Sequence, residues 1–547
     1  MSRGVPFPPD GLPSPGPRYA TRGMVASSSP EAAAVGMRVL LDGGNASDAA
    51  VAVALVEGLT LPASCGLGGD AFAVLYDARS RRVYGLNGSG VAPRAATRER
   101  YLSRGMAVIP AQGWDAVAIP GAAHAYWTLH HRFGSRRWPE LVEPAIRYAE
   151  AGVPVSRRIH QWITESRAKL EQFPATAAVC LPGGQARRVG TRWRRPDYAW
   201  SLRQLAEGGA DAFYRGSIAA EIVRCSEEAG GLFTDDDFAQ HETEVYEPIH
   251  TTYRGVEVYE TRPPSQGFLL LEILNLLEGF DLAGSGFGTP DAIHLMVEAT
   301  KLAFADRLRH AGDPHFVEMP LPELLSKEFA TRRRRAIDPH RAADTVPAAA
   351  PSDLRRDTTS FCVVDAQGNA ISFIHSLFGA WGSGVVAGRT GITLNNRGRG
   401  FTLEEGHPNV LAGGKRPMHT LNCYLLMREG ALYAVGNTPG GDMQPQWNAQ
   451  VICSLLDFGM DAQQAVTAPR WHIFPGADPA VQGQPVELRL ESRFGAAVMD
   501  ELRARGHRVV DTGPWTGGGW CQIIVVDHDG VLAGGSDPRA GSIALGV

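Results

Sequence analysis

Between residues 120 and about 306, apolar side chains recur every three to four positions, which is the spacing of helices that bury one face. Two Ala-rich segments nearer the N-terminus have the same character, and Gly43-Gly-Asn45 separates them as a stop signal. The pattern predicts helices over residues 30–41, 46–59, 122–132, 138–151, 217–228, 267–278 and 290–306.

After residue 358 the pattern changes to short runs rich in β-branched and aromatic residues, which predict strands. Turn signals such as Glu429-Gly430 and Asp529-Gly530 separate these runs into hairpins. The predicted hairpins pair 72–76 with 82–86, 421–427 with 431–435, and 521–527 with 531–533. Helices on both sides of sheets built from hairpins predict an α+β layered fold.

The most informative segment runs from Thr358 to Ser376 and has the pattern of one further β-hairpin. Its turn, Asp365-Ala-Gln-Gly-Asn369, closes as a three-residue loop when Gly368 takes the left-handed conformation. Paired residue numbers then sum to 734, as in 365 + 369, and Thr358 lies directly opposite Ser376. Two hydroxyl groups therefore face each other at the edge of a strand.

A Thr at a new chain N-terminus carries its own base, because an α-amine titrates near pH ~8 and is partly neutral at physiological pH. The Arg- and Ala-rich run before Thr358 has the composition of a surface linker. A precursor could therefore be cut at its end, between Asp357 and Thr358. Thr358 would then be a catalytic nucleophile. Most Thr-Thr hairpins are ordinary sheet, so the hairpin alone does not decide between these two interpretations.

This hypothesis divides the chain into a large piece, residues 23–357, and a small catalytic piece, residues 358–547. Residues 1–22 are rich in Pro and Gly and are predicted to form a disordered tail. Residues 331–357, which include the run from Arg332 to Arg335, are predicted to form a solvated linker.

Composition restricts the partners and the compartment. The formal net charge of −5 argues against a general nucleic-acid-binding protein. No run reaches about 18 uninterrupted apolar residues, and the N-terminus lacks the apolar core of a signal peptide, so no membrane association is expected. Seven cysteines in an odd, scattered set fit free thiols in a reducing compartment, and a cytoplasmic location is expected.

Ordered motifs over most of the chain resemble those of γ-glutamyltransferases, which are self-cleaving N-terminal-nucleophile hydrolases. Where the small subunit of that family begins, the matching residues are Thr358-Thr359, Val363-Val-Asp365, Gly368-Asn369, Gly382-Ser-Gly384, Gly391-Ile392 and Leu394-Asn-Asn396. Further matches are Gly23-Met-Val-Ala26, Gly43-Gly-Asn-Ala-Ser-Asp-Ala-Ala50, Gly66-Leu-Gly-Gly69, Pro263-Pro-Ser265, Gly312-Asp-Pro314, Gly414-Lys-Arg-Pro417, Thr438-Pro-Gly-Gly441 and Gly535-Ser-Asp-Pro-Arg539. The resemblance implies a four-layer αββα sandwich in which both pieces share one core and stay together as a heterodimer, with a higher oligomer left open.

The resemblance also implies the roles of four residues. Thr358 is the nucleophile, first on its own preceding peptide bond and then on a substrate. Ser376 takes the place of a Thr that hydrogen-bonds the nucleophile, and it keeps the hydroxyl. Gly440 and Gly441 match the oxyanion-hole pair, where glycines ahead of a helix let backbone N–H groups point at a developing oxyanion.

The positions that bind the substrate in that family differ here. Ser89 replaces an Arg that binds a carboxylate, Phe378 replaces an Asn that binds an α-amine, and Gly400 lies at an acidic position. A Ser-Ser pair becomes His419-Thr420. An α-ammonium group would therefore lose its acidic and amide partners, so a standard γ-glutamyl substrate is not expected.

Arg397 and Arg399 offer a different way to bind a carboxylate, because a guanidinium group can hold it with a fork of two hydrogen bonds. Arg397 is either such a carboxylate-binding residue or a structural surface Arg. His419 is either a polar group of the pocket or part of loop packing, whereas His375 alternates away from Thr358 and is expected to pack. These features resemble the branch that contains oxamate amidohydrolases and cephalosporin-type acylases.

The sequence thus predicts an autoprocessing Thr-nucleophile amidohydrolase or acyltransferase that acts on a small amide with a carboxylate-bearing acyl group. It contains no Walker A loop, no G-x-S-x-G elbow and no zinc-type Cys/His set, so neither a metal nor a cofactor is expected. Three alternatives stay open: a γ-glutamyltransferase that hydrolyses glutathione, a specialised acyl or C–C bond hydrolase of a natural-product pathway, and an uncleaved, non-catalytic scaffold.

Overall fold

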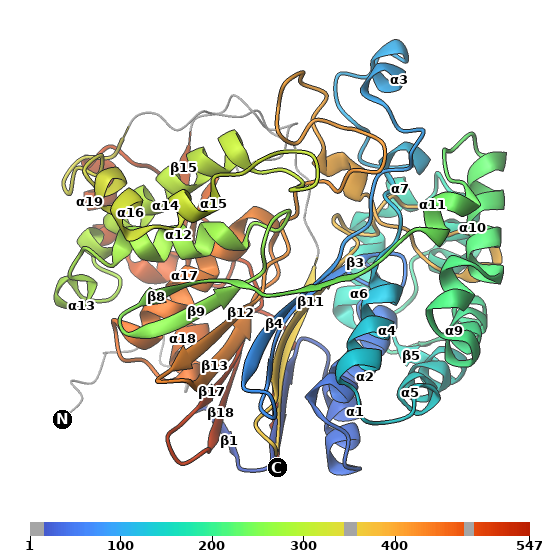
Figure 1. Ribbon diagram of the computed structural model, residues 1–547, viewed down its shortest axis with the longest axis horizontal. Coiled ribbons are helices and arrows are strands. Elements are labelled where there is room, and N and C mark those ends of the chain that lie inside the picture. The colour runs from blue at the N-terminus through green and yellow to red at the C-terminus, as the bar shows by residue number, and fades with distance from the viewer. Residues whose placement is uncertain (1–15, 344–357, 475–485) are drawn as a thin grey trace.

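Two antiparallel sheets of seven strands each stack face to face, and helices cover the outer face of both (Figure 1). The computed structural model describes residues 16–343, 358–474 and 486–547. Three apolar clusters separate the layers, one between the sheets and one under the helices on each side. The predicted α+β fold, a four-layer αββα sandwich, is confirmed.

Sheet I contains the hairpin that the sequence singles out. In spatial order its strands are β19 (Ile543–Gly546), β2 (Gly23–Ser27), β10 (Thr359–Asp365), β11 (Ala370–Ser376), β3 (Asp70–Asp77), β4 (Arg82–Gly88) and β7 (Glu244–Tyr246). Sheet II has the order β1 (Arg18–Ala20), β18 (Leu532–Ser536), β17 (Gln522–Val526), β13 (Ala431–Asn437), β12 (Tyr424–Arg428), β9 (Val256–Glu260) and β8 (Ile249–Tyr253). Two minor sheets consist of β14 (Trp471–Phe474), β15 (Glu487–Leu490) and β16 (Arg508–Asp511), and of β5 (Val153–Pro154) and β6 (Arg192–Trp193).

Each sheet has its own group of helices. The helices on the side of sheet I are α1 (Pro30–Leu41), α2 (Ala46–Thr60), α4 (Ala122–Phe133), α5 (Trp138–Ala151), α9 (Pro196–Tyr214) and α10 (Ser217–Glu228). Those on the side of sheet II are α12 (Gly267–Leu277), α14 (Pro290–His310), α16 (Lys327–Arg334), α17 (Gln444–Leu456), α18 (Ala462–Thr467) and α19 (Ala496–Ala504). Shorter helices are α3 (Arg98–Ser103), α6 (Arg157–Glu165), α7 (Arg167–Leu170), α8 (Pro174–Cys180), α11 (Asp235–Ala239), α13 (Leu282–Ser285) and α15 (Leu321–Leu324).

Alternation along the central hairpin sends its side chains into two different cores. On β11, Phe373 belongs to the cluster under the helices, whereas Ile374 belongs to the cluster between the sheets. Thr358 and Ser376 share the parity of the residues that face sheet II. The two hydroxyl groups therefore lie at the end of the space between the two sheets.

Strands from both sides of the proposed cut interleave in both sheets. β10 pairs with β2 of the large piece on one side and with β11 on the other, and β11 pairs with β3. In sheet II, β12 pairs with β9, and β18 pairs with β1. The two pieces therefore share one core, and a cut before Thr358 leaves these strand ladders intact.

The hairpin has the predicted register. Thr359 lies opposite His375, so paired residue numbers again sum to 734. Gly368 has a φ of 82°, the left-handed conformation that the three-residue loop requires. Asp365 Oδ1 accepts the N–H groups of Gln367 and Asn369, each at 2.9 Å, which holds the turn in place.

The prediction of a disordered tail up to residue 22 is wrong for its last part. Arg18–Ala20 forms β1, which pairs with the edge of β18. The N–H groups of Thr21 and Arg22 then donate to the carbonyl of Val547. Backbone pairing needs no apolar pattern, so little in residues 18–20 themselves indicates a strand. Residues 1–15 lie outside the described part of the chain.

The linker prediction is also wrong where it begins, because residues 331–334 are the last turn of α16. Arg333 makes two hydrogen bonds to Asp306, at 2.8 and 3.0 Å, and Arg334 Nε donates to the carbonyl of Leu276 at 2.8 Å. These basic side chains are used in packing against α12 and α14. Residues 344–357, which include Asp357, lie outside the described part.

Two further properties concern the helices and the cysteines. Among the described residues, no helix is both long and apolar enough to cross a membrane. All seven cysteines are free thiols, and Cys225 alone of the seven is not buried.

A buried polar cluster holds the last described residues of the large piece. His294 Nε2 lies 2.7 Å from the carbonyl of Asp338, and its Nδ1 lies 2.8 Å from His507 Nε2. Lys301 Nζ donates to the carbonyl of Ala343 at 3.2 Å. Residues 338–343 are thereby attached to α14.

This cluster makes a prediction about acid stability. Burial, reinforced by the positive charge of Lys301, lowers the pKa of His507 to about 3, whereas an unfolded His titrates near ~6.5. The unfolded chain binds the proton more readily, so the free energy of unfolding falls as pH drops from about 6.5 towards 3. His507→Gln, which can still donate to His294, should flatten this slope by up to about 1.4 kcal/mol per pH unit. Urea unfolding between about pH 7 and pH 4 measures the slope.

The matched control is His528→Gln, because the His528 side chain is 89% exposed. This variant should keep the wild-type slope. An identical slope for His507→Gln and wild type would contradict the assignment of His507 as a buried, neutral imidazole.

Candidate active site

The hydroxyl groups of Thr358 and Ser376 meet at the end of the central hairpin. Thr358 Oγ1 and Ser376 Oγ lie 2.9 Å apart, and both side chains are buried. They lie where β10 begins and β11 ends, on the face that points towards sheet II. The structure thus brings together the pair that the hairpin register predicts.

Asp70 continues this row on the neighbouring strand. It lies directly opposite Ser376 in the pairing of β11 with β3, and it is fully buried. Its Oδ2 accepts Arg397 Nε–H at 2.9 Å, and its Oδ1 accepts the N–H of Gly90 at 3.0 Å. His419 Nε2 lies 3.6 Å from Oδ2. A buried carboxylate therefore lies beside the two hydroxyl groups.

Sequence reasoning did not identify Asp70, although it directly follows the Gly66-Leu-Gly-Gly69 motif. The signal was its parity with Phe72 and Val74, which places a carboxylate on an otherwise apolar strand face. A buried carboxylate requires a partner. That partner, Arg397, is 327 residues further along the chain, so no local pattern connects the two.

The side chains around this ion pair, namely Asp70, Phe378, Arg397 and His419, form what we call the Arg397 corner. Burial raises the pKa of the Asp70 carboxyl, and the Arg397 guanidinium acts in the opposite direction. Burial, together with the charges of Arg397 and Arg416, holds the pKa of His419 well below its usual range. The corner thus contains one ion pair and a neutral imidazole.

Phe378 connects the hydroxyl pair to this corner. Its φ of 79° is in the left-handed region, which costs a bulky residue about 1–3 kcal/mol. In this conformation its N–H donates to Ser376 Oγ at 2.8 Å. Its ring lies against the guanidinium of Arg397, with Cζ 4.5 Å from the ring centroid. The strained backbone therefore positions both an N–H group and an aromatic face.

The predicted oxyanion turn follows β13 and leads into α17. Gly440 and Gly441 have φ values of 138° and 60°. A Cβ atom on Gly440 would lie 2.2 Å from the ring of Trp447, so both conformation and space require glycine there. Backbone N–H groups in such a turn ahead of a helix are suited to stabilise an oxyanion.

Two residues of the large piece hold this turn. Gln266 Nε2 donates to the carbonyls of Thr420 at 2.6 Å and Gly441 at 2.9 Å. Arg307 donates to Gln266 Oε1 at 2.5 Å and to Asp442 Oδ1 at 2.6 Å. Thr420 and Gly441 are thus joined through one amide group. Sequence analysis did not identify Gln266 or Arg307, which lie on different elements from the residues they hold.

The remaining predictions for the pocket have mixed outcomes. Arg397 is fully buried, so the alternative of a surface Arg is wrong. His419 both contacts Asp70 and packs against Phe72, with ring centroids 4.8 Å apart. Ser89 is buried next to Gly90, and its hydroxyl donates to Asn87 Oδ1 at 2.6 Å.

His375 lies on the opposite face of sheet I, which confirms its expected packing role. Its Nε2 lies 2.8 Å from Glu57 Oε2, and its Nδ1 lies 2.7 Å from the hydroxyl of Tyr126. Glu57, Cys65 and His375 are close enough to contact one ion. Both nitrogens of the His375 ring already make hydrogen bonds, so this cluster is satisfied without one.

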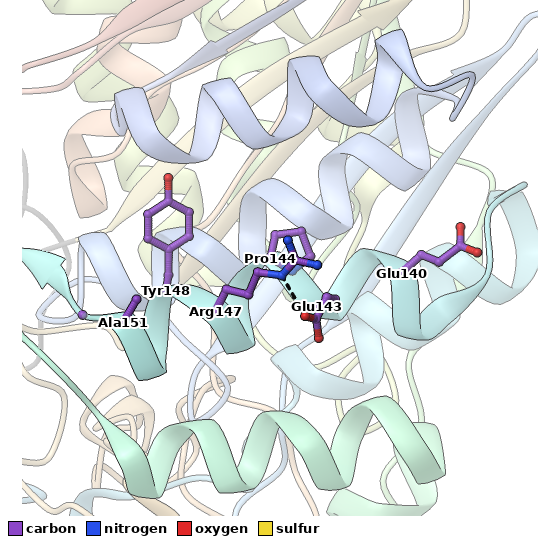
Figure 2. Close-up of a pocket in the computed structure, with 7 residues that line it drawn as sticks. Glu140, Glu143, Pro144, Arg147, Tyr148 and Ala151 are labelled. Atoms are coloured by element: carbon purple, nitrogen blue, oxygen red, sulfur yellow. Dashed lines mark hydrogen bonds and ion pairs between the residues drawn. The ribbon is translucent and has the colours of Figure 1, made fainter.

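A surface depression along α5 lies apart from these residues (Figure 2). Its lining includes Glu140, Glu143, Arg147 and Tyr148, and Glu143 pairs with Arg147 at 2.8 Å. An ion pair one helical turn apart is typical of a solvated helix face. No predicted site residue lines this depression, and we assign it no role.

Known proteins share both the sequence and the fold. The sequence profile of the gamma-glutamyltranspeptidase family matches residues 32–547. The glutathione hydrolase-like YwrD proenzyme of Bacillus subtilis is 37% identical over 533 residues, which covers 96% of this chain and 99% of the relative. The oxamate amidohydrolase proenzyme of Klebsiella pneumoniae is 32% identical over 536 residues, with coverage of 96% and 99%. The crystal structure of a cephalosporin acylase from Bacillus halodurans has a TM-score of 0.89 at 35% identity and covers 99% of both chains.

These relatives are a glutathione hydrolase-like protein, an amidohydrolase and an acylase, and the first two are proenzymes. The matches extend over almost the whole chain and include the segment from Thr358 to the oxyanion turn. The chain is an enzyme that belongs to the gamma-glutamyltranspeptidase family.

Proposed function

We propose that this chain is a precursor that cuts itself between Asp357 and Thr358 and then cleaves small amides through an acyl intermediate on Thr358. The observation that supports this most directly is the 2.9 Å contact between the hydroxyls of Thr358 and Ser376. An adjacent hydroxyl of this kind orients a nucleophile, and the interleaved sheets keep it in place after the cut.

In the self-cleavage step, Thr358 Oγ1 attacks the carbonyl carbon of Asp357. A C–O bond forms and the peptide C–N bond breaks, and the proton of Oγ1 passes to the leaving nitrogen, so an ester joins the two pieces while Thr358 gains a free α-amine. Water then hydrolyses the ester and releases the carboxyl end of the large piece. Ser376 holds Oγ1 in position throughout by the hydrogen bond already present.

In the substrate step, the new α-amine takes the proton of Thr358 Oγ1 while the oxygen attacks the amide carbonyl carbon. The N–H groups of Gly440 and Gly441 stabilise the oxyanion, and one such donor contributes about 2.7–4 kcal/mol to transition-state stabilisation. The amine product leaves with the proton. The acyl group then passes from Thr358 to water or, in a transferase reaction, to an acceptor amine.

We propose that the acyl group carries a carboxylate, which Arg397 binds. The guanidinium group is buried next to the row of hydroxyl groups, and a buried carboxylate needs a cationic partner of this kind. A γ-glutamyl group would also bring an α-ammonium. The nearby carboxylate, Asp70, already accepts hydrogen bonds from Arg397 and Gly90 through both oxygens. Acyl groups without the amine are therefore favoured over the glutathione alternative.

The first test is intact-mass spectrometry of freshly purified protein. Wild type should give two masses that meet between Asp357 and Thr358, whereas Thr358→Ala should give one uncut mass, because it lacks the attacking oxygen. Thr359→Ala is the matched control, since its side chain lies on the other face of β10, and it should be cut like wild type. An uncut wild-type chain would support the scaffold alternative instead.

A second test concerns the neighbouring hydroxyl. Ser376→Ala removes one hydrogen bond to the nucleophile, which is worth about 0.5–1.5 kcal/mol, so self-cleavage should slow by about 2- to 12-fold. Ser376→Thr keeps the hydroxyl and should retain most of the rate. A time course of precursor loss on denaturing gels measures both. Equal rates of self-cleavage for Ser376→Ala and wild type would show that the Ser376 hydroxyl has no role in positioning Thr358 Oγ1.

A third test compares anilides of three matched acyl groups: glutaryl has the carboxylate, butyryl lacks it, and γ-glutamyl adds the α-amine. We expect kcat/KM for glutaryl to exceed both others by about tenfold or more, as for one charged hydrogen-bonded contact. Arg397→Met should remove the advantage of glutaryl over butyryl. A preference for γ-glutamyl in wild type would favour the glutathione alternative.

A further inference from the structure

Asp70 is a buried, ion-paired side chain beside the hydroxyl pair to which the proposed chemistry assigns no role. It is fully buried, and it reaches the corner from β3 of the large piece, whereas Arg397 and Phe378 belong to the small piece. An unpaired carboxylate in such a place is unfavourable, so the contacts of Asp70 must offset the cost of burying its charge. These contacts are with Arg397 Nε at 2.9 Å and with the N–H of Gly90 at 3.0 Å.

The Arg397 guanidinium is restrained in two independent directions. Asp70 binds its Nε edge, which fixes the rotation of the plane about the end of the side chain. The Phe378 ring lies 4.5 Å from its Cζ, which fixes where the flat face points. A planar group held at one edge and one face has a single orientation, and it presents its fork of N–H groups without reorganisation.

The charges of the Arg397 corner also indicate that the orientation of the guanidinium group matters. Arg397 stays protonated at every accessible pH, and Asp70 balances its charge. His419, at 3.6 Å from Asp70, is neutral because its surroundings are buried and already contain Arg397 and Arg416. The corner is therefore close to neutral before substrate binds. Its discrimination between acyl groups depends on how the guanidinium is oriented more than on excess positive charge.

We propose that Asp70 is a positioning residue that orients Arg397 towards the acyl carboxylate and so determines the preference for anionic over neutral acyl groups. This rests on the proposed function, in which Arg397 meets that carboxylate. Because Asp70 comes from the large piece and Arg397 from the small piece, both pieces contribute a residue that determines specificity.

The test measures kcat/KM for glutaryl and butyryl anilides on the same preparation of each variant. The ratio of the two values does not depend on how much enzyme is folded or self-cleaved. Asp70→Asn keeps the shape of the side chain but loses the charge, and it should lower the glutaryl-to-butyryl ratio about tenfold or more. Most of the loss should appear as a higher KM for glutaryl, because binding of a remote carboxylate is lost in ground and transition states alike.

Two further variants separate positioning from a structural role. In a cycle with Arg397→Met, adding Asp70→Asn should leave the ratio unchanged, because the group on which Asp70 acts is absent. Arg397→Lys keeps the charge but cannot make the Nε contact, so it should lower the ratio as Asp70→Asn does. This variant tests the proposal even if Asp70→Asn does not fold. Asp77→Asn, at the opposite and more exposed end of β3, is the matched control and should behave like wild type.

Three results would overturn the proposal. The first is an unchanged ratio in Asp70→Asn, and the second is an equal loss for both substrates, which indicates a purely structural role. The third is a selective loss of γ-glutamyl turnover in Asp70→Asn, which would mean that Asp70 binds a substrate ammonium directly. A wild-type chain that stays uncut and turns over no anilide would instead overturn the proposed function, so the two failures are distinguishable.

Discussion

The double pairing of β10 is the constraint on which the rest of the site depends. This strand is hydrogen-bonded to β2 on one side and to β11 on the other, and both of its faces are buried. Thr358 directly precedes this strand, so the proposed nucleophile would keep a fixed position after the proposed cut. The same ladder continues from β11 to β3 and places Asp70 in line with the two hydroxyls. A single register therefore positions three polar groups.

Buried polar groups of the site are satisfied by partners from distant parts of the chain. Asp70 pairs with Arg397, and Asp442 pairs with Arg307, with all four side chains at most 1% exposed. Such pairs contribute little net stability, because desolvation offsets much of the attraction, but removing one partner is costly. These pairs matter for geometry, since each holds a guanidinium group in a defined position within the candidate site. The first lies beside the hydroxyl pair of Thr358 and Ser376, and the second lies beside the predicted oxyanion turn.

The parts of the structure that follow local rules could be predicted from the sequence. The contact between Thr358 and Ser376 follows from strand parity and one glycine turn, and α1, α5 and α10 have the bounds that hydrophobic periodicity indicates. The glycines of the oxyanion turn are visible as a motif. Asp70, Gln266 and Arg307 could not be predicted in this way, because their partners are brought close only by the stacking of the sheets. The strand Arg18–Ala20 and the last turn of α16 were missed for a related reason: tertiary hydrogen bonds determine their state, whereas their composition resembles that of loops.

The interleaving of the two pieces has a consequence for how the mature enzyme responds to damage. While the chain is continuous, unfolding and refolding are unimolecular, and the sheets can reassemble from one molecule. After the proposed cut before Thr358, recovery requires two separate polypeptides to meet, because both pieces supply strands to each sheet. Recovery then depends on protein concentration, and neither piece alone has a complete sheet to fold around. The lifetime of the mature enzyme is therefore set by the barrier to its unfolding, whereas the precursor has access to a reversible equilibrium.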